Sequence, residues 1–145
     1  MIKDIEYYNK IMECFKAHRV HFNTEFEKDP KLSGKSLLLK DKSCFHIFTL
    51  RGDRKSDNKK IRKILNSHKL RFATDEELLE VAGVISGCLP PFGRPLIDID
   101  HYIDEELLQN EFISFNAAIA DKKVRLKMED YLKMANPSIC EFKKL

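Results

Sequence analysis

The sequence has no long apolar run and no recognisable targeting segment. No stretch approaches the roughly 20 apolar residues that a membrane-spanning helix needs. The N-terminus, MIKDIEYYNK, lacks the apolar core of a signal peptide. Internal repeats, low-complexity tracts and linkers are also missing, and 145 residues are the length of one ordinary domain. These absences predict a cytosolic protein without a membrane partner, folded as a single domain over residues 1–145.

Cysteine is scarce, and its spacing argues against two common uses. The four cysteines lie far apart, with no C-x-x-C pair and no histidine at ligand spacing, so a structural zinc site is not expected. Disulfides are not expected either, because no secretory signal is present. We therefore expect four reduced thiols, no metal and no cofactor.

Glycine and proline are also few, with five of each, and they gather in one segment. Residues 84–95, VISGCLPPFGRP, hold three of the prolines and two of the glycines. Such a segment can be neither a regular helix nor a central strand. It is predicted to be a rigid loop.

The remaining chain shows alternating short strand and helix patterns. Apolar residues at three- and four-residue spacing predict a helix whose buried face is Ile5, Tyr8, Ile11, Met12 and Phe15. Strands are expected at 20–26, 70–73 and 96–99, and hairpins at 36–40 with 44–50 and at 112–118 with 124–128. Further helices should begin at Ser56 or Asp57, at the Thr74–Glu77 capping box, at Asp104 and near Asp130. Hairpins with scattered helices favour an α+β fold with a mixed, largely antiparallel sheet and flanking helices.

Positive charge is local rather than general. The net charge is only +3, but residues 51–63 carry seven Lys or Arg against two Asp. A local basic face can bind a phosphate backbone. The competing interpretation is a solvated surface without a partner.

Three segments, in order, resemble the YbaK and prolyl-tRNA editing (ProX-like) family. The first is GKSLLLKD at residues 34–41, similar to the family's lysine-led strand. The second is KLRFATDEEL at 69–78 followed by GVISGCLPPFG at 83–93, which contains a G-x-x-x-P loop from Gly87 to Pro91. The third is ISFNAA at 113–118, where relatives carry F-N-A-G or F-H-P. The resemblance covers roughly residues 35–137.

The resemblance implies an activity without a cofactor. Family members hydrolyse the ester of a mischarged tRNA, so this chain is expected to be a metal-independent hydrolase in translation. Its partners would be the acceptor end of an aminoacyl-tRNA and an aminoacyl-tRNA synthetase. An activated ester needs positioning, a water molecule and stabilisation of the oxyanion. The family fold, a mixed sheet with flanking helices, agrees with the fold class expected from the patterns.

The resemblance also implies site residues. Lys35, which follows a flexible Gly34, would hold a phosphate or carbonyl oxygen. Backbone N–H groups of the loop would face the oxyanion, with Gly87, Cys88 and Leu89 as the available donors. The Cys88 thiol has no identifiable base partner, which favours a packed or pocket-lining role over nucleophilic catalysis. The substrate-binding residues implied are Ser36, Pro91, Asn116 and Ala118.

The basic stretch of residues 51–63 supplies candidate tRNA contacts. The candidate cations are Arg51, Arg54, Lys55, Lys59 and Lys60.

The sequence departs from the family pattern in three places. The segment before Lys35 is short, Ala118 replaces a common glycine, and Asn116 replaces the histidine of alanine-specific relatives. These departures keep open a non-catalytic module that binds aminoacyl-tRNA or aminoacyl-adenosine. A general RNA-binding domain is a third alternative, although no aromatic RNP-like motif supports it.

Overall fold

The computed structural model describes residues 2–145 and has an α+β fold. The elements are α1 (Asp4–Ala17), β1 (Phe22–Asn23), β2 (Gly34–Lys40), β3 (Phe45–Arg51), α2 (Asn58–Leu65), β4 (Arg71–Phe72), α3 (Asp75–Ala82), β5 (Asp100–Asp104), the 3-10 helix η1 (Glu105–Gln109), β6 (Phe112–Asn116), β7 (Lys123–Lys127), α4 (Met128–Ala135) and β8 (Ser138–Cys140). The predicted class is confirmed.

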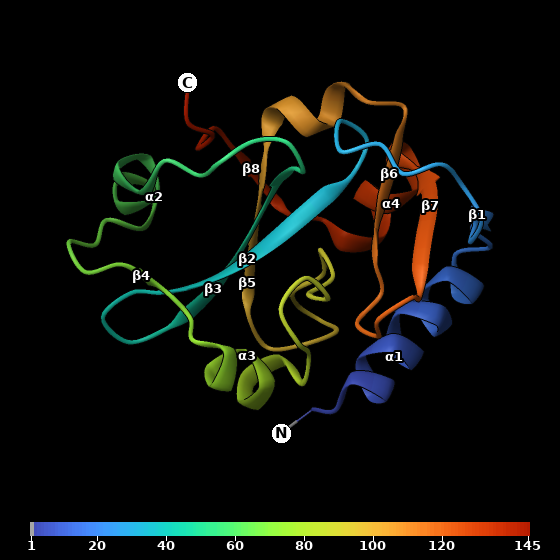
Figure 1. Cartoon of the computed structure of the whole chain (residues 1–145), viewed down its shortest axis with the longest axis horizontal. Helices are drawn as coiled ribbons and strands as arrows, with labels where there is room; N and C mark the ends of the chain where they lie inside the picture. Colours follow the sequence, from blue (N-terminus) through green and yellow to red (C-terminus); the bar gives the residue numbers. More distant parts are fainter. Residues whose placement is uncertain (1) are drawn as a thin grey trace.

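Two sheets carry the strands (Figure 1). The larger has the order β4-β2-β3-β5-β8, and the smaller has the order β1-β7-β6. Both predicted hairpins, β2–β3 and β6–β7, are antiparallel as expected. The pairings of β5 with β3 and with β8 are parallel, and the sequence patterns did not predict β8.

The two faces of the β2–β3 hairpin bury different cores. One face contributes Leu38 and Ile47 to the main core, which both sheets share with α1, α3 and α4. The other face packs Leu39, Phe48 and Leu50 against Ile61 of α2 and Phe142. Because β3 is covered on both faces, its sequence FHIFTLR has apolar residues on both faces rather than on alternate positions only.

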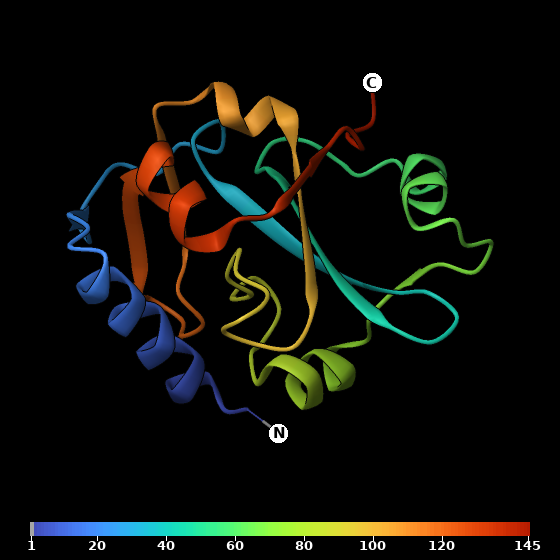
Figure 2. The same ribbon diagram turned by 180° about the vertical axis from the view of Figure 1, so that it is seen from behind.

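The helices lie around the sheets at well separated places. Helix α1 runs beside the smaller sheet, whereas α2 lies at the opposite end of the molecule (Figure 1). The view from behind shows the same separation, with α3 between the two helices (Figure 2). The loop that follows α3 is thereby placed over the middle of the fold.

The helix boundaries follow the predicted caps. Asp57 accepts a hydrogen bond from the Lys59 N–H at the start of α2. Thr74 and Glu77 form the reciprocal capping box at the start of α3. Gly83 ends α3 with φ +71°, a conformation that favours glycine. These caps fix where the loop of residues 84–95 begins.

Three local predictions are wrong. Only Phe22 and Asn23 of the expected 20–26 strand pair with β7, and Phe22 remains exposed. Residues 96–99 form turns, and the strand begins at Asp100. The buried face of α1 carries Tyr7, Ile11 and Phe15, while Ile5 is exposed. Tertiary packing left Phe22 and Ile5 exposed and buried the apolar residues of 96–99 in turns, and the local spacing alone did not contain that information.

Candidate functional site

A cavity of about 370 Å³ lies where five segments of the chain meet. It contains Lys35, Gly87 and Asn116, one residue from each of the three segments that carry the resemblance. The lining residues are Phe26, Lys28, Pro30, Ser33, Gly34, Lys35, Gly52, Gly87, Ser114, Phe115, Asn116 and Lys123. The fold therefore brings together groups that are up to about 97 residues apart in sequence, counted from Phe26 to Lys123.

Lys35 is the second residue of β2, opposite Leu50 of β3. Its side chain is half-buried, and burial lowers its pKa below the ordinary value of 10.5, partly offset by the nearby Asp53 carboxylate. The expectation of a flexible Gly34 is wrong. Gly34 is a buried strand residue, and a Cβ there would lie 3.0 Å from the Ile113 Cδ1 atom and 3.3 Å from Thr49 Cγ2. Glycine is needed for close packing that fixes the position of Lys35.

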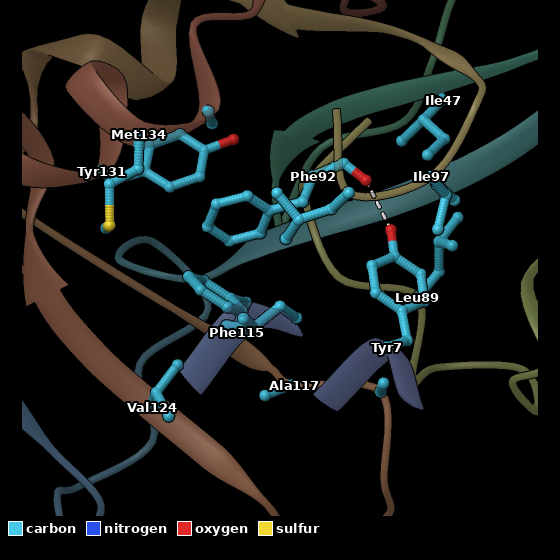
Figure 3. Packing of buried hydrophobic residues seen from close by; sticks show 14 of the residues in the cluster. Tyr7, Ile47, Leu89, Phe92, Ile97, Phe115, Ala117, Val124, Tyr131 and Met134 are labelled. Carbon is cyan, nitrogen blue, oxygen red and sulfur yellow. Dashed lines mark hydrogen bonds between the residues drawn. The ribbon is translucent and has the colours of Figure 1, made fainter. Parts of the chain in front are cut away.

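The loop of residues 84–95 is held rigidly by two buried tyrosines. The Tyr131 hydroxyl donates to the Pro91 carbonyl at 2.7 Å, and the Tyr7 hydroxyl donates to the Phe92 carbonyl (Figure 3). The Phe92 ring packs edge-on against Phe115 and Tyr131. Burial raises the pKa of both tyrosines far above the ordinary value of 10, so both hydroxyls keep their protons.

Gly87 is the part of this loop that reaches the cavity. Its φ is +87°, and an added Cβ would meet nothing within 4 Å. Of the three N–H groups predicted to face the oxyanion, that of Cys88 is already donated to the Ile85 carbonyl at 3.0 Å. Within residues 2–145, the N–H groups of Gly87 and Leu89 donate to no protein acceptor. Gly87 is consequently the best-placed backbone donor.

Asn116 ends β6 and lines the same cavity. Its Oδ1 atom is buried and has no hydrogen-bond partner among the described residues. An unpaired buried acceptor costs free energy unless a ligand or water satisfies it. The amide oxygen is therefore available to a donor group on a bound molecule.

The other predicted site residues do not line this cavity. Cys88 and Leu89 are buried in the main core, and burial raises the pKa of the Cys88 thiol. Pro91 contributes its carbonyl to the Tyr131 hydroxyl. The Ser36 hydroxyl is 2.7 Å from Thr49 Oγ1, and neighbouring strand residues face opposite sides of a sheet. Ser36 is thus on the face opposite Lys35.

Ala118 is buried in the β6–β7 turn with φ +75°. This is the left-handed region, which glycine occupies without strain and alanine does not. The backbone conformation suits the glycine that the family resemblance led us to expect at this position. Ala118 therefore affects the conformation of the turn that follows Asn116.

The predicted tRNA-binding cations fall into two groups. Arg54 forms two hydrogen bonds to Glu106 at 2.9 and 2.8 Å, and Arg51 forms two to Asp53 at 2.7 and 2.9 Å. Lys60 is bound to Glu141 at 2.6 Å. Lys55 and Lys59 are exposed, and no carboxylate of residues 2–145 pairs with them.

Phe115 of β6 and Lys123 of β7 are among eight lining residues that the sequence did not single out. Three of them, Phe26, Lys28 and Pro30, form the wall contributed by the segment before β2. Ser33, Gly52 and Ser114 line the cavity where that segment is bound to the sheets: the Gly52 N–H donates to Ser33, and the Ser114 N–H donates to Leu32. These are tertiary contacts, for which the local sequence carries no signal.

Residues 2–145 contain neither a cluster suited to a metal ion nor a helix suited to crossing a membrane. No cluster of three or more His, Cys, Asp or Glu side chains is arranged to hold a metal ion there. No helix in the same range is long and apolar enough to cross a membrane.

Structural comparison identifies the same fold in a known protein. The chain superposes with a TM-score of 0.79 on a crystal structure described as a candidate trans-editing enzyme for prolyl tRNA synthetase. The match covers 96% of this chain and 98% of that one, with 18% sequence identity. At this identity the likeness concerns the fold.

Sequence comparison adds two relatives and a family. The chain is 31% identical over 98 residues to the multifunctional Ser/Thr-tRNA deacylase ProXp-y of Escherichia coli (strain K12). The match covers 66% of this chain and 57% of that protein, so it spans less than two thirds of the relative's length. It is 32% identical over 76 residues to a proline–tRNA ligase of Bacillus pumilus (strain SAFR-032), covering 52% and 13%. The family described as the aminoacyl-tRNA editing domain matches residues 20–134. The chain therefore belongs to the aminoacyl-tRNA editing domain family, as the three sequence segments predicted.

Proposed function

We propose that the chain is a trans-acting deacylase that hydrolyses the ester of a mischarged tRNA. The observation that carries the proposal is the convergence of Lys35, Gly87 and Asn116 on one cavity. Their chemistry differs and is complementary: a cation, a backbone donor and an unpaired acceptor. The named activity of the Escherichia coli relative, a Ser/Thr-tRNA deacylase, supports the same reaction class.

Hydrolysis of an aminoacyl ester passes through a tetrahedral intermediate with a negative oxygen. In the proposed mechanism the Gly87 N–H donates to that oxyanion, and the Lys35 ammonium adds a positive charge in a half-buried site. A water molecule attacks the carbonyl carbon and loses a proton to solvent. The bond to the ribose oxygen then breaks, and that oxygen takes up a proton and leaves as the hydroxyl. No residue of the chain becomes covalently attached, and no metal is required.

Asn116 would hold the aminoacyl group. Its unpaired Oδ1 suits a donor on the substrate, either the α-amino group or a side-chain hydroxyl. A site built to hydrogen-bond a hydroxyl can discriminate strongly against an analogue without it, because the acceptor is then left unpaired. Serine and threonine esters are therefore the first substrates to test, with alanine, cysteine and proline esters beside them.

The proposal extends to partners and organisation. We propose that residues 1–145 act as one editing domain that binds the acceptor end of a charged tRNA in the cytosol, where translation takes place. A synthetase that produces the mischarged tRNA is the natural second partner, and the match to a proline–tRNA ligase supports this choice.

A deacylation screen over a panel of charged tRNAs tests the proposal. Purified protein should release one or a few amino acids faster than the Lys35→Ala variant and buffer alone. Tight binding of charged tRNA without release would contradict the proposal and favour the non-catalytic binding module.

A further inference from the structure

Three lysines from three separate segments line the cavity. Lys28 belongs to the segment before β2, Lys35 to β2 and Lys123 to β7. No aspartate or glutamate is among the residues that line it. All charged residues that line the cavity are therefore positive. The whole chain, in contrast, has nearly balanced charge, with 26 basic and 23 acidic residues.

These three lysines have no carboxylate partner within residues 2–145. Several other cations do have a carboxylate partner, as Arg54 has Glu106 and Arg71 has Glu77. Like charges gathered in one cavity without an ion-pair contact repel one another and destabilise the fold slightly. Such an arrangement is typical of a surface that binds an anion.

The walls that carry Lys28 and Lys123 are fixed by backbone contacts. Lys123 lies directly opposite Asn116 in the β6–β7 ladder. Lys28 precedes a turn in which the Leu32 and Ser33 N–H groups both donate to the Asp29 carbonyl. Since the turn is also bound to β6 and to Gly52, the two lysines face a cavity of set width.

The chemistry of a charged tRNA end identifies the anion. The carboxyl group of the amino acid is esterified and carries no charge, and the α-amino group is neutral or positive. The nearest negative charge is the phosphate that joins the terminal adenosine to the preceding nucleotide. Lysine binds phosphate as a compact point charge without demanding one orientation.

We propose that Lys28 and Lys123 bind the 5′-phosphate of the terminal adenosine. This inference rests on the proposed function, because it names the part of the substrate that the same cavity holds. The phosphate fixes the position of the nucleotide, so that the ester lies beside Gly87 and Asn116. Lys28 and Lys123 thus bind the substrate and do not take part in the chemistry.

The experiment compares two minimal substrates that differ only in this phosphate. One is adenosine esterified at its 3′-oxygen with the amino acid best removed in the tRNA screen, and the other is the same ester of adenosine 5′-monophosphate. The parent protein should prefer the phosphorylated ester by about tenfold or more in kcat/KM, since hydrogen bonds to charged groups are strong. The Lys28→Ala/Lys123→Ala double variant should lose this preference and keep the parent rate on the adenosine ester.

Lys122→Ala is the matched control, because Lys122 is an exposed neighbour of Lys123 that does not line the cavity. It should keep the full preference. A double variant that retains the preference, or that loses activity equally on both esters, would overturn the inference.

A binding measurement separates this inference from the proposed function. Titration with adenosine 5′-monophosphate and with adenosine, followed by amide chemical shifts, needs no turnover. The parent should bind the monophosphate more tightly, and the double variant should bind the two equally. If no charged tRNA is deacylated, the proposed function fails, while the titration still decides whether the lysines bind the phosphate. Equal binding of both ligands by the parent would overturn the inference even in an active enzyme.

Discussion

Asn116 and Lys123 face each other across the β6–β7 pair, and both line the cavity that also contains Lys35 and Gly87. Among residues 2–145, the Asn116 Oδ1 atom has no hydrogen-bond partner and the neighbouring Lys123 has no carboxylate partner. Neither feature stabilises the isolated protein. A bound molecule that supplies a hydrogen-bond donor to Asn116 and an anion to Lys123 would account for both features.

Asn116→Ala should reduce deacylation far more than stability. The Oδ1 atom has no partner in the free protein, so its removal should change the free energy of unfolding by about 1 kcal/mol or less. If Oδ1 accepts from the substrate, kcat/KM should fall about tenfold or more. Denaturant unfolding and steady-state kinetics measure the two effects separately.

The choice of amino acid refines this prediction. A larger loss on serine and threonine esters than on alanine esters would show that Oδ1 accepts from the side-chain hydroxyl. An equal loss on all esters would indicate the α-amino group. A variant that is unstable but catalytically normal per folded molecule would contradict both roles.

Lys35→Ala should abolish hydrolysis and leave the fold intact. The residue lies near the start of β2, beyond the part of the strand that pairs with β4, and a change there should alter stability by about 0.5 kcal/mol at most. A circular dichroism spectrum and an unfolding curve like those of the parent are the controls. Near-normal turnover of a cognate charged tRNA would show that Lys35 is not the key residue.

The pKa of Lys35 adds a pH dependence. Burial lowers this pKa, so the ammonium loses its proton at a lower pH than an ordinary lysine does. If the charged form is needed, enzymatic hydrolysis, corrected for the spontaneous reaction, should decline as pH rises through the lowered value. Lys35→Arg should move this decline to higher pH, because arginine keeps its charge.

The structure brings together three of the eight predicted catalytic and substrate-binding residues in one cavity. Lys35, Gly87 and Asn116 were found because the family constrains them chemically, and the structure brings all three together. Lys28 and Lys123 were missed because exposed lysines are common and only the tertiary fold places these two on the cavity. The predicted donors beyond Gly87 also failed to reach it, since the loop turns back and buries Cys88.

The fold predictions succeeded where a signal is local. The capping box at Thr74, the cap at Asp57 and both hairpins depend on neighbouring residues, and all are confirmed. The parallel pairings of β5 and the short strand β8 depend on residues distant in sequence. Local periodicity carries no information about such pairings.

Two glycines of the cavity should respond differently to alanine. At Gly87 space is open but φ is +87°, so Gly87→Ala should cost about 1–2 kcal/mol through backbone strain and shift the proposed donor. At Gly52 a Cβ would lie 2.8 Å from the Pro30 carbonyl oxygen and also clash with the Ser33 hydroxyl. Gly52→Ala should displace the turn that forms the cavity wall.

Kinetics and unfolding curves distinguish the two variants. Gly87→Ala should lower kcat, because its N–H would no longer point at the oxyanion. Gly52→Ala should mainly raise KM, because the wall contributes to binding rather than to the chemistry. A Gly87→Ala variant with a normal kcat would contradict the expected displacement of this N–H.

The basic stretch should contribute through its unpaired members. Lys55→Ala/Lys59→Ala should weaken tRNA binding and reduce the slope of log affinity against log salt, by about 0.7 to 0.9 for each lost phosphate contact. Arg54 is held by Glu106, so Arg54→Ala is expected to have the smaller effect. Hydrolysis at saturating tRNA should change little in either variant. Unchanged binding at every salt concentration would show that tRNA binds to another surface. Lys40, Lys42 and residues 122–127 are the next candidates.

His101 should make the protein sensitive to mild acid. The residue is only 7% exposed, its Nε2 atom is 2.8 Å from Thr49 Oγ1, and burial lowers its pKa to about 3. Between that value and the ordinary 6.5, the unfolded chain binds a proton that the folded chain does not. Stability is therefore complete above about pH 6.5 and falls as pH decreases, by about 3 kcal/mol at pH 4.

The comparison with His101→Gln isolates this contribution. Urea unfolding from pH 7 to pH 4 should show a shallower loss of stability in the variant than in the parent, because glutamine does not titrate. His68→Gln removes an exposed histidine and should leave the parent slope unchanged. Lowered pKa values of Asp41 and Glu77 also reduce stability in acid, but they act equally in all three proteins. Parallel stability curves for the parent and His101→Gln would show that His101 is protonated in the folded state as readily as in the unfolded chain.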